Sequence, residues 1–121
     1  MDIIIGNSSG KPIYEQITNQ IKGLILKETL APGDALPSMR LLAKELRISV
    51  ITTKRAYEEL EREGFIETIP GKGSFVAKKN LEFMREEQLR IIEDYLEKAV
   101  CKAKSTGIPY EELAKILQLL Y

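Results

Sequence analysis

The sequence predicts a mostly α-helical chain with one small β-hairpin, organised as two parts, residues 1–78 and residues 79–121. Three observations lead to this fold class. Apolar residues recur every three or four positions in five segments, which is the periodicity of helices with one buried face. Two short β-prone runs flank the sequence Pro-Gly-Lys-Gly, whose glycines permit a tight reversal. The 121 residues, 44% of them hydrophobic, are enough to bury a core.

The first predicted helix spans residues 11–30, where isoleucines at positions 13, 17, 21 and 25 would share one face. Pro12 suits the first turn of such a helix because its missing N–H has no partner there in any case. Residues 31–34, with the sequence Ala-Pro-Gly-Asp, combine a helix stop with turn residues. Residues 35–37 are too few for more than an extended link.

Two further helices follow closely. Ser38 offers an N-cap hydroxyl to residues 39–46, and Ser49 offers one to a helix that ends near Gly64. The connection is so short that these two helices must cross steeply. Residues 65–69 and 74–77 are the strands of the hairpin. We expect the core of this part to contain Ile17, Ile21, Leu42, Leu46, Ile48, Leu60 and Val76.

Helix, helix, turn, helix and hairpin is the order of a winged helix-turn-helix, a fold that places its recognition helix in a DNA groove. Charge agrees with this interpretation although the whole chain is neutral, with 18 basic and 18 acidic residues. Residues 37–55 carry five basic side chains and one acidic one, Glu45. Four glutamates lie further along, at positions 58, 59, 61 and 63. The third helix is therefore polarised, with its first turns suited to phosphates.

The remaining 43 residues predict a two-helix tail, with one helix over about residues 81–104 and another from Pro109. Their apolar residues would leave a large exposed patch on a monomer, so we expect a homodimer. The alternative is that this patch packs on the first helix of its own chain. The residues expected at the dimer interface are Leu89, Ile92, Leu96, Leu113, Ile116, Leu117 and Leu120.

Composition excludes several kinds of site. The chain has no His and a single Cys, so a Cys/His zinc site, a Ser-His-Asp triad and a disulfide framework are ruled out. We expect no metal, no cofactor and no catalysis. Cys101 follows Ala99 and Val100, which favours a reduced structural thiol. No stretch is long and apolar enough to span a bilayer, and the start is acidic, so we expect a cytoplasmic protein without membrane contact.

Four motifs occur in order. They are PIYEQI at residues 12–17, LxPGDxLPSxRxLA at 30–43, SxxTxxRAYxxLxxxG at 49–64 and GKGSFV at 71–76. Together they resemble the DNA-binding domain of the GntR family of bacterial transcription regulators, over about residues 11–77. The short helical tail resembles the YtrA subfamily. The resemblance implies a winged helix-turn-helix in residues 1–78, a helical dimerisation tail in residues 79–121, and a double-stranded DNA operator as partner.

Carried over position by position, the resemblance implies DNA contacts from all three parts of the winged helix. An arginine fork can bind a guanine edge or a phosphate, hydroxyls near a helix start can bind phosphates or bases, and a glycine-containing wing can approach the minor groove. The two serines also serve as N-caps. The implied contact residues are Ser38, Arg40, Ser49, Thr52, Lys54, Arg55, Lys72 and Gly73.

Three positions depart from the family pattern. Val50 stands where many members have an arginine, and Ile51 stands where a polar residue is common. These two side chains either touch thymine methyl groups or pack inward, and the sequence does not separate the two. Thr53 replaces an aliphatic residue, and we expect its methyl group to face the core.

The sequence therefore predicts a repressor that binds a palindromic operator as a homodimer. The alternative is a winged-helix module for protein interaction, with the acidic residues 58–63 as its working face. An enzyme ranks third, because catalysis needs a pocket with convergent titratable groups. The carboxylates of this chain are expected at exposed helical positions instead. A small-molecule effector, if one acts, is expected between subunits or between the tail and the DNA-binding domain, because residues 79–121 are too few to enclose a pocket.

Overall fold

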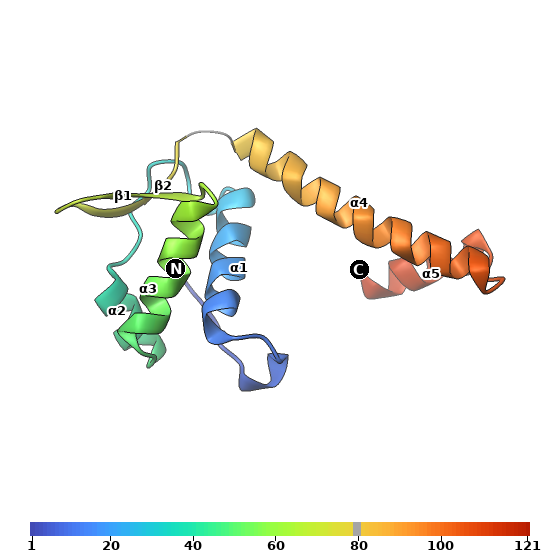
Figure 1. Cartoon of the computed structure of the whole chain (residues 1–121), viewed down its shortest axis with the longest axis horizontal. Helices are drawn as coiled ribbons and strands as arrows, with labels where there is room; N and C mark the ends of the chain where they lie inside the picture. The colour runs from blue at the N-terminus through green and yellow to red at the C-terminus, as the bar shows by residue number, and fades with distance from the viewer. Residues whose placement is uncertain (79–80) are drawn as a thin grey trace. The chain divides into compact units, whose positions relative to one another are not determined.

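Residues 1–78 and 81–121 are described by a computed structural model (Figure 1). In chain order the elements are the 3-10 helix η1 (Asn7–Ser9), α1 (Ile13–Leu26), α2 (Met39–Leu46), α3 (Val50–Arg62), β1 (Ile66–Ile69), β2 (Gly73–Val76), α4 (Leu81–Ser105) and α5 (Tyr110–Leu120). The chain divides into two compact units, Met1–Leu81 and Glu82–Tyr121, called here the winged unit and the tail unit. Residues 79 and 80, the first two residues of the predicted tail, lie outside the described residues. The predicted fold class, mostly helical with a hairpin wing, is confirmed.

Helix α1 is shorter than predicted at both ends. Pro12 is its N-cap, with extended backbone, and not a residue of its first turn. The helix ends at Leu26 because the chain turns over the next two residues, where Glu28 adopts a positive φ of 60°. Ile25 is the last buried residue of the helix, so the segment beyond it gains no burial from staying helical.

The two serine caps are confirmed. The Ser38 hydroxyl accepts a hydrogen bond from the Leu41 N–H at 3.1 Å and thereby caps α2. The Ser49 hydroxyl accepts one from the Thr52 N–H at 3.1 Å and caps α3. Between the helices Arg47 takes a left-handed conformation with φ 57°, which lets three residues complete the turn.

A short third segment, which precedes α2, pairs with the hairpin. Strands β1 and β2 pair antiparallel, with Glu67 opposite Phe75. The segment from Gly33 to Pro37, called here the link, runs along the other edge of β2, where the Leu36 N–H donates to the Ser74 carbonyl at 2.9 Å. The prediction of an extended link holds, but the link also joins α2 to the wing through these hydrogen bonds.

The core of the winged unit forms mainly between α1 and α3, with α2 and the hairpin closing its sides. Five of the seven expected core residues are buried: Ile17, Ile21, Leu42, Leu60 and Val76. The expectation is wrong for Leu46 and Ile48, which are only half-buried. They flank the surface turn at Arg47 and are therefore covered on one side only. Thr53 is fully buried, as expected, and its hydroxyl donates to the Ser49 carbonyl at 3.2 Å.

Tyr57 ties α3 to the link. Its side chain is 1% exposed, and its hydroxyl donates to the Pro37 carbonyl at 2.7 Å. Burial raises the pKa of this phenol, so the hydroxyl stays protonated and keeps its role as a donor. Since Ser38 directly follows Pro37, this hydrogen bond positions the start of α2 against α3.

The tail unit consists of α4 and α5. The Ile108 N–H donates to the Ala103 carbonyl at 2.9 Å and closes the turn between them, and Pro109 is the N-cap of α5. Glu111 and Glu112 lie in the first turn of α5, where the helix dipole favours them. Within the described part of the chain, none of the helices has the length and apolar content needed to cross a membrane.

We expect Tyr57→Phe to lower the free energy of unfolding by about 1–3 kcal/mol, because the half-buried Pro37 carbonyl would lose its partner. Urea denaturation followed by circular dichroism measures this. Tyr95→Phe is the matched control, since Tyr95 is 68% exposed and should tolerate the same change without loss. Equal stability of the Tyr57→Phe variant and the wild type would show that the hydrogen bond contributes nothing to the fold.

Candidate nucleic-acid interface

The first turn of α3 presents two hydroxyl groups side by side. The Ser49 and Thr52 hydroxyl oxygens lie 2.8 Å apart, and Ser49 is exposed while Thr52 is half-exposed. This turn contains no acidic residue. The backbone N–H groups of the helix start add a positive field at the same place. The turn can therefore accept a phosphate or a base edge without charge repulsion.

Helix α2 adds an unpaired cation to this surface. Arg40 is exposed, and it forms no ion pair with any residue of the described ranges 1–78 and 81–121. Ser38, also exposed, precedes it at the N-cap. A guanidinium group without an internal partner is free to bind a phosphate or a guanine edge in the bidentate manner.

Two other predicted contact residues on α3 already have partners within the chain. The Lys54 ammonium lies 3.9 Å from a Glu58 carboxylate oxygen, an exposed pair that contributes little. The Arg55 guanidinium lies over the ring of Tyr14 on α1, 3.8 Å from its centroid. The sequence gives no signal for this stacking, because Tyr14 and Arg55 meet only through the packing of α1 on α3. Arg55 is thus directed toward α1.

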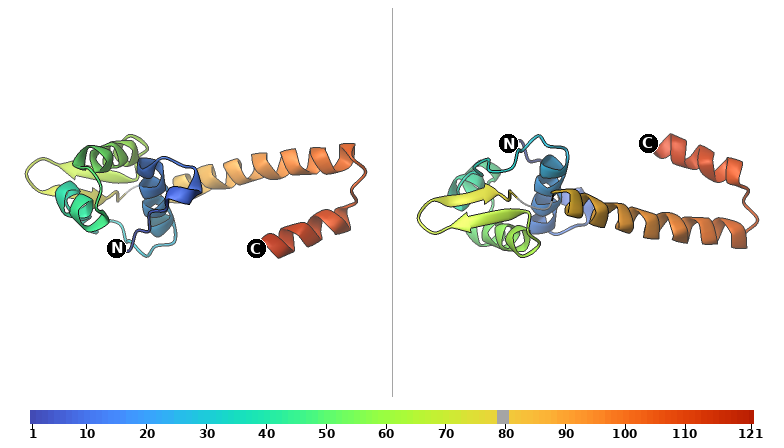
Figure 2. Two further views of the ribbon diagram at one scale, coloured as in Figure 1. Left: turned by 90° about the horizontal axis from the view of Figure 1, so that it is seen from below. Right: turned by 90° about the horizontal axis from the view of Figure 1, so that it is seen from above.

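The wing is a tight turn between β1 and β2. Its tip contains Lys72, which is exposed, between Gly71 and Gly73 with φ values of 78° and 106°. Residues other than glycine rarely adopt these φ values, so the turn needs glycine on both sides of Lys72. Both views in Figure 2 show the tip projecting beyond the helices of the winged unit. Lys72 can therefore reach a surface that the helices also touch.

The acidic residues on the distal half of α3 are mostly neutralised within the chain. Glu63 pairs with Lys22 of α1 at 2.6 Å, and Glu59 pairs with Arg62. The hydrogen bond from Arg62 lowers the pKa of the Glu59 carboxyl, and the same bond raises the pKa of the Arg62 guanidinium. These pairs reduce the net negative charge of the acidic face that the interaction-module alternative requires.

Val50 and Ile51 do not pack inward. They are 45% and 81% exposed, whereas the other large apolar residues of α3, Tyr57 and Leu60, are at most 1% exposed. The sequence left two alternatives for these side chains, contact with thymine methyl groups or packing into the core. Packing into the core is wrong. These aliphatic groups lie in the same turn as the hydroxyl pair.

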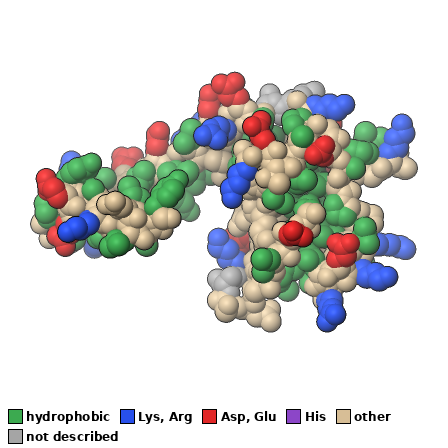
Figure 3. All heavy atoms as spheres, turned by 180° about the vertical axis from the view of Figure 1, so that it is seen from behind, with side chains coloured by type: hydrophobic (Ala, Val, Ile, Leu, Met, Phe, Trp, Pro, Cys, Tyr) green, Lys and Arg blue, Asp and Glu red, His purple; other side chains and the backbone are tan. Residues whose placement is uncertain are grey.

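Figure 3 shows basic side chains along one edge of the winged unit and apolar side chains over the tail unit. In the tail, α4 and α5 frame an apolar groove of about 340 Å³, at the lower end of the size of ligand sites. The sequence predicts that residues 79–121 are too few to enclose a ligand pocket of ordinary size. The groove forms because the two helices diverge from their connecting turn. Its lining includes Leu96, Leu113, Ile116, Leu117 and Leu120, five of the seven residues expected at a dimer interface.

The seven residues of the expected dimer interface are largely open to solvent. Leu89, Ile92, Leu96, Ile116 and Leu117 are 44–51% exposed, and Leu120 is 80% exposed. Leu113 is half-buried. The apolar surface predicted from the helical spacing is therefore present on the tail unit, and within residues 82–121 no other element covers it.

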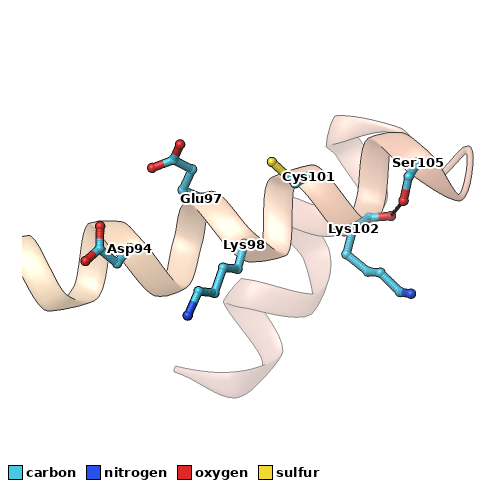
Figure 4. Close-up of a pocket in the computed structure, with 6 residues that line it drawn as sticks. All are labelled: Asp94, Glu97, Lys98, Cys101, Lys102 and Ser105. Atoms are coloured by element: carbon cyan, nitrogen blue, oxygen red, sulfur yellow. Dashed lines mark hydrogen bonds between the residues drawn. The ribbon is translucent and has the colours of Figure 1, made fainter.

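A second hollow, of about 670 Å³, lies on α4 (Figure 4). Its lining comes from that helix alone, so no second element closes it. The charges there are of both signs, and the Ser105 hydroxyl donates to the Lys102 carbonyl at 3.0 Å. Cys101 lies in this hollow as a free thiol, but it is exposed, so the expectation that it serves a structural role is wrong for the chain as described. Among the described residues, no three His, Cys, Asp or Glu side chains gather as metal ligands would.

Comparison with known proteins agrees with this geometry. Residues 13–76 match the family described as bacterial regulatory proteins, gntR family. The chain is 40% identical over 111 residues to the HTH-type transcriptional repressor YtrA of Bacillus subtilis, which covers 92% of this chain and 85% of that protein. Since the winged unit ends at Leu81, this match extends into the tail.

Solved structures show the same fold. A transcriptional regulator from Oenococcus oeni superposes with a TM-score of 0.75 at 30% identity, over 96% of both chains. The DNA-binding domain of AraR in complex with operator ORE1 superposes with a TM-score of 0.54 at 25% identity, over 64% of this chain and 94% of that one. The chain therefore belongs to the gntR family of bacterial regulatory proteins.

Proposed function

We propose that the chain is a transcriptional repressor that binds a palindromic DNA operator as a homodimer, with one winged unit on each half-site. The observation that carries this proposal is an exposed, unpaired Arg40 on α2 together with the exposed hydroxyl pair of Ser49 and Thr52 on α3, the two helices of a helix-turn-helix. The DNA-binding domain of AraR, which has the same fold, is known in complex with an operator, and this supports operator binding by the present chain. Such a regulator works in the cytoplasm, where bacterial DNA lies, and performs no catalysis.

Each element has a distinct role in the proposed complex. Helix α3 enters the major groove, where the Ser49 and Thr52 hydroxyls bind a phosphate or a base edge. Arg40 on α2 binds a guanine or clamps a phosphate, and Ser38 binds the backbone beside it. At the wing, Lys72 adds charge at the minor groove while Gly73 lets the backbone approach.

The two remaining residues of the proposed contact set act by charge. Lys54 and Arg55 lie on the second turn of α3, and both bring positive charge near the DNA backbone. Arg55 must leave the Tyr14 ring to reach a phosphate, at a cost of about 0.5–1 kcal/mol for an exposed stacking of this kind. We therefore rank Arg55 below Lys54 among the contacts.

The proposed dimer forms through the tail unit. Its seven interface residues are exposed or half-buried on the chain, and an apolar surface of this extent on α4 and α5 is typical of a surface that a partner covers. A twofold axis through the tail would supply the two copies of α3 that a palindrome requires. A small effector would then bind at the subunit boundary, where the apolar groove lies.

We expect Arg40→Ala to change the sequence preference of DNA binding and Lys72→Ala to change only its overall affinity. Arg40→Ala should cost about 1–3 kcal/mol on the selected operator and relax the preference at one operator position, because it removes a base contact. Lys72→Ala should weaken binding to all sequences about equally, because it removes a backbone contact. Fluorescence anisotropy on the operator and on point-substituted duplexes measures both. Uniform loss for both variants would reassign Arg40 to a phosphate clamp.

Two substitutions at Ser49 separate its capping role from its DNA contact. Ser49→Ala should lower the free energy of unfolding by about 1 kcal/mol through loss of the N-cap. Ser49→Asp should keep the stability, since aspartate caps equally well, but should weaken DNA binding at least tenfold because it places a carboxylate against the phosphates. Unfolding and anisotropy measurements on the same samples provide the test. DNA affinity unchanged in Ser49→Asp would place this turn outside the interface.

Deletion of residues 80–121 should leave a folded monomer with weak operator binding, because residues 1–79 contain the buried core of the winged unit. In the dimer, binding of one winged unit holds the second near its half-site, and this effective concentration multiplies affinity by roughly 10²–10⁴. Operator affinity should therefore fall by that factor when the tail is deleted. Binding to an isolated half-site should barely change. Sedimentation and anisotropy measure the two effects.

The full-length variant Leu117→Glu should likewise be monomeric, because it places a carboxylate in the apolar groove. Leu119→Glu is its control, since Leu119 is 84% exposed and lies outside the groove lining. A truncated protein that still sediments as a dimer would place the interface in the winged unit instead.

A further inference from the structure

Ile51 is an exposed aliphatic side chain within a polar surface. It is 81% exposed, with Val50 beside it at 45%. Helix α3 already buries an apolar face made of Ala56, Tyr57 and Leu60, so the fold does not require an isoleucine on its other side. Ile51 thus contributes nothing to the core of the winged unit, and its apolar surface is available to a ligand.

The surroundings of Ile51 restrict what that ligand is. Ser49 and Thr52 flank it with hydroxyl groups, Lys54 adds a cation, and the first turn of α3 carries no carboxylate. Two aliphatic side chains are too small a patch for a stable protein interface, which needs several hundred Å² on each partner. An anionic ligand with a small apolar group fits both features. In the DNA major groove the C5-methyl of thymine is the apolar group on a base edge, and phosphates lie on both sides of it.

We propose that Ile51, with Val50 beside it, contacts a thymine C5-methyl group in each half-site and makes the chain select thymine over cytosine at that position. This inference rests on the proposed function, since it requires α3 to enter the major groove. In this proposal an apolar side chain recognises the base at a position where a polar side chain would recognise it through hydrogen bonds. Specificity at this position then depends on the removal of a methyl group from water, not on hydrogen bonds.

The test is a double-mutant cycle between Ile51→Ala and deoxyuridine in place of thymidine. Uracil lacks only the C5-methyl, so this exchange leaves all hydrogen-bonding groups of the base in place. The operator is first selected from a random-sequence duplex pool with the full-length chain. Each thymine of the half-site is then replaced in turn, symmetrically in both half-sites, and affinity is measured by fluorescence anisotropy.

For the wild type we expect one thymine at which the exchange weakens binding about fourfold per half-site, or roughly fifteenfold for the palindrome, the value for removing one methyl group from a buried contact. Ile51→Ala should weaken binding to the thymine operator by at least this factor, and the exchange to uracil should then have no further effect. Ile4→Ala is the matched control, because Ile4 is 80% exposed in the same unit. Its affinity should equal that of the wild type, and both variants should unfold at the wild-type urea concentration.

Three results would overturn the inference while leaving the proposed function intact. They are specific binding with no uracil-sensitive position, wild-type affinity for Ile51→Ala, or an undiminished uracil effect in Ile51→Ala, which would assign the methyl contact to another residue. Failure of the selection to yield any preferred duplex would overturn the proposed function itself. The two failures are therefore distinguishable.

Discussion

The hydrogen bond from the Tyr57 hydroxyl to the Pro37 carbonyl is the constraint on which the geometry of the winged unit depends. The link that ends at Pro37 pairs with β2 through Leu36 and continues into α2 at Ser38. Tyr57 attaches this same link to α3. The three elements that carry the proposed DNA contacts, α2, α3 and the wing, are therefore held to one another through one five-residue segment. A rigid arrangement of this kind reduces the ordering cost of binding.

Local signals made much of this unit predictable. The bounds of α2 and the start of α3 follow from Ser38 and Ser49, whose capping hydrogen bonds involve residues only three positions away. Core positions with strict helical spacing, such as Ile17 and Ile21, were also predictable, because burial of one helix face depends mainly on periodicity. Family motifs then indicated the surface that is proposed to contact DNA.

The features that the sequence did not predict all depend on contacts between distant segments. The stacking of Arg55 on Tyr14 joins α3 to α1, and the partial exposure of Leu46 and Ile48 depends on what surrounds the turn at Arg47. The orientation of Ile51 was ambiguous for the same reason, since an apolar residue in a first turn faces inward or outward according to how the helix packs. Helix α1 ended early because burial stops at Ile25, which spacing alone does not reveal.

Salt dependence of operator binding tests the central claim most directly, because that claim assigns the surface of α2, α3 and the wing to phosphate contacts. The measurement is the affinity of the full-length chain for its selected operator between 50 and 200 mM salt. With some 6–10 phosphate contacts per dimer, affinity should fall by roughly 10³–10⁵ over this range. An affinity that does not change with salt would contradict the account and would indicate a surface that binds protein instead.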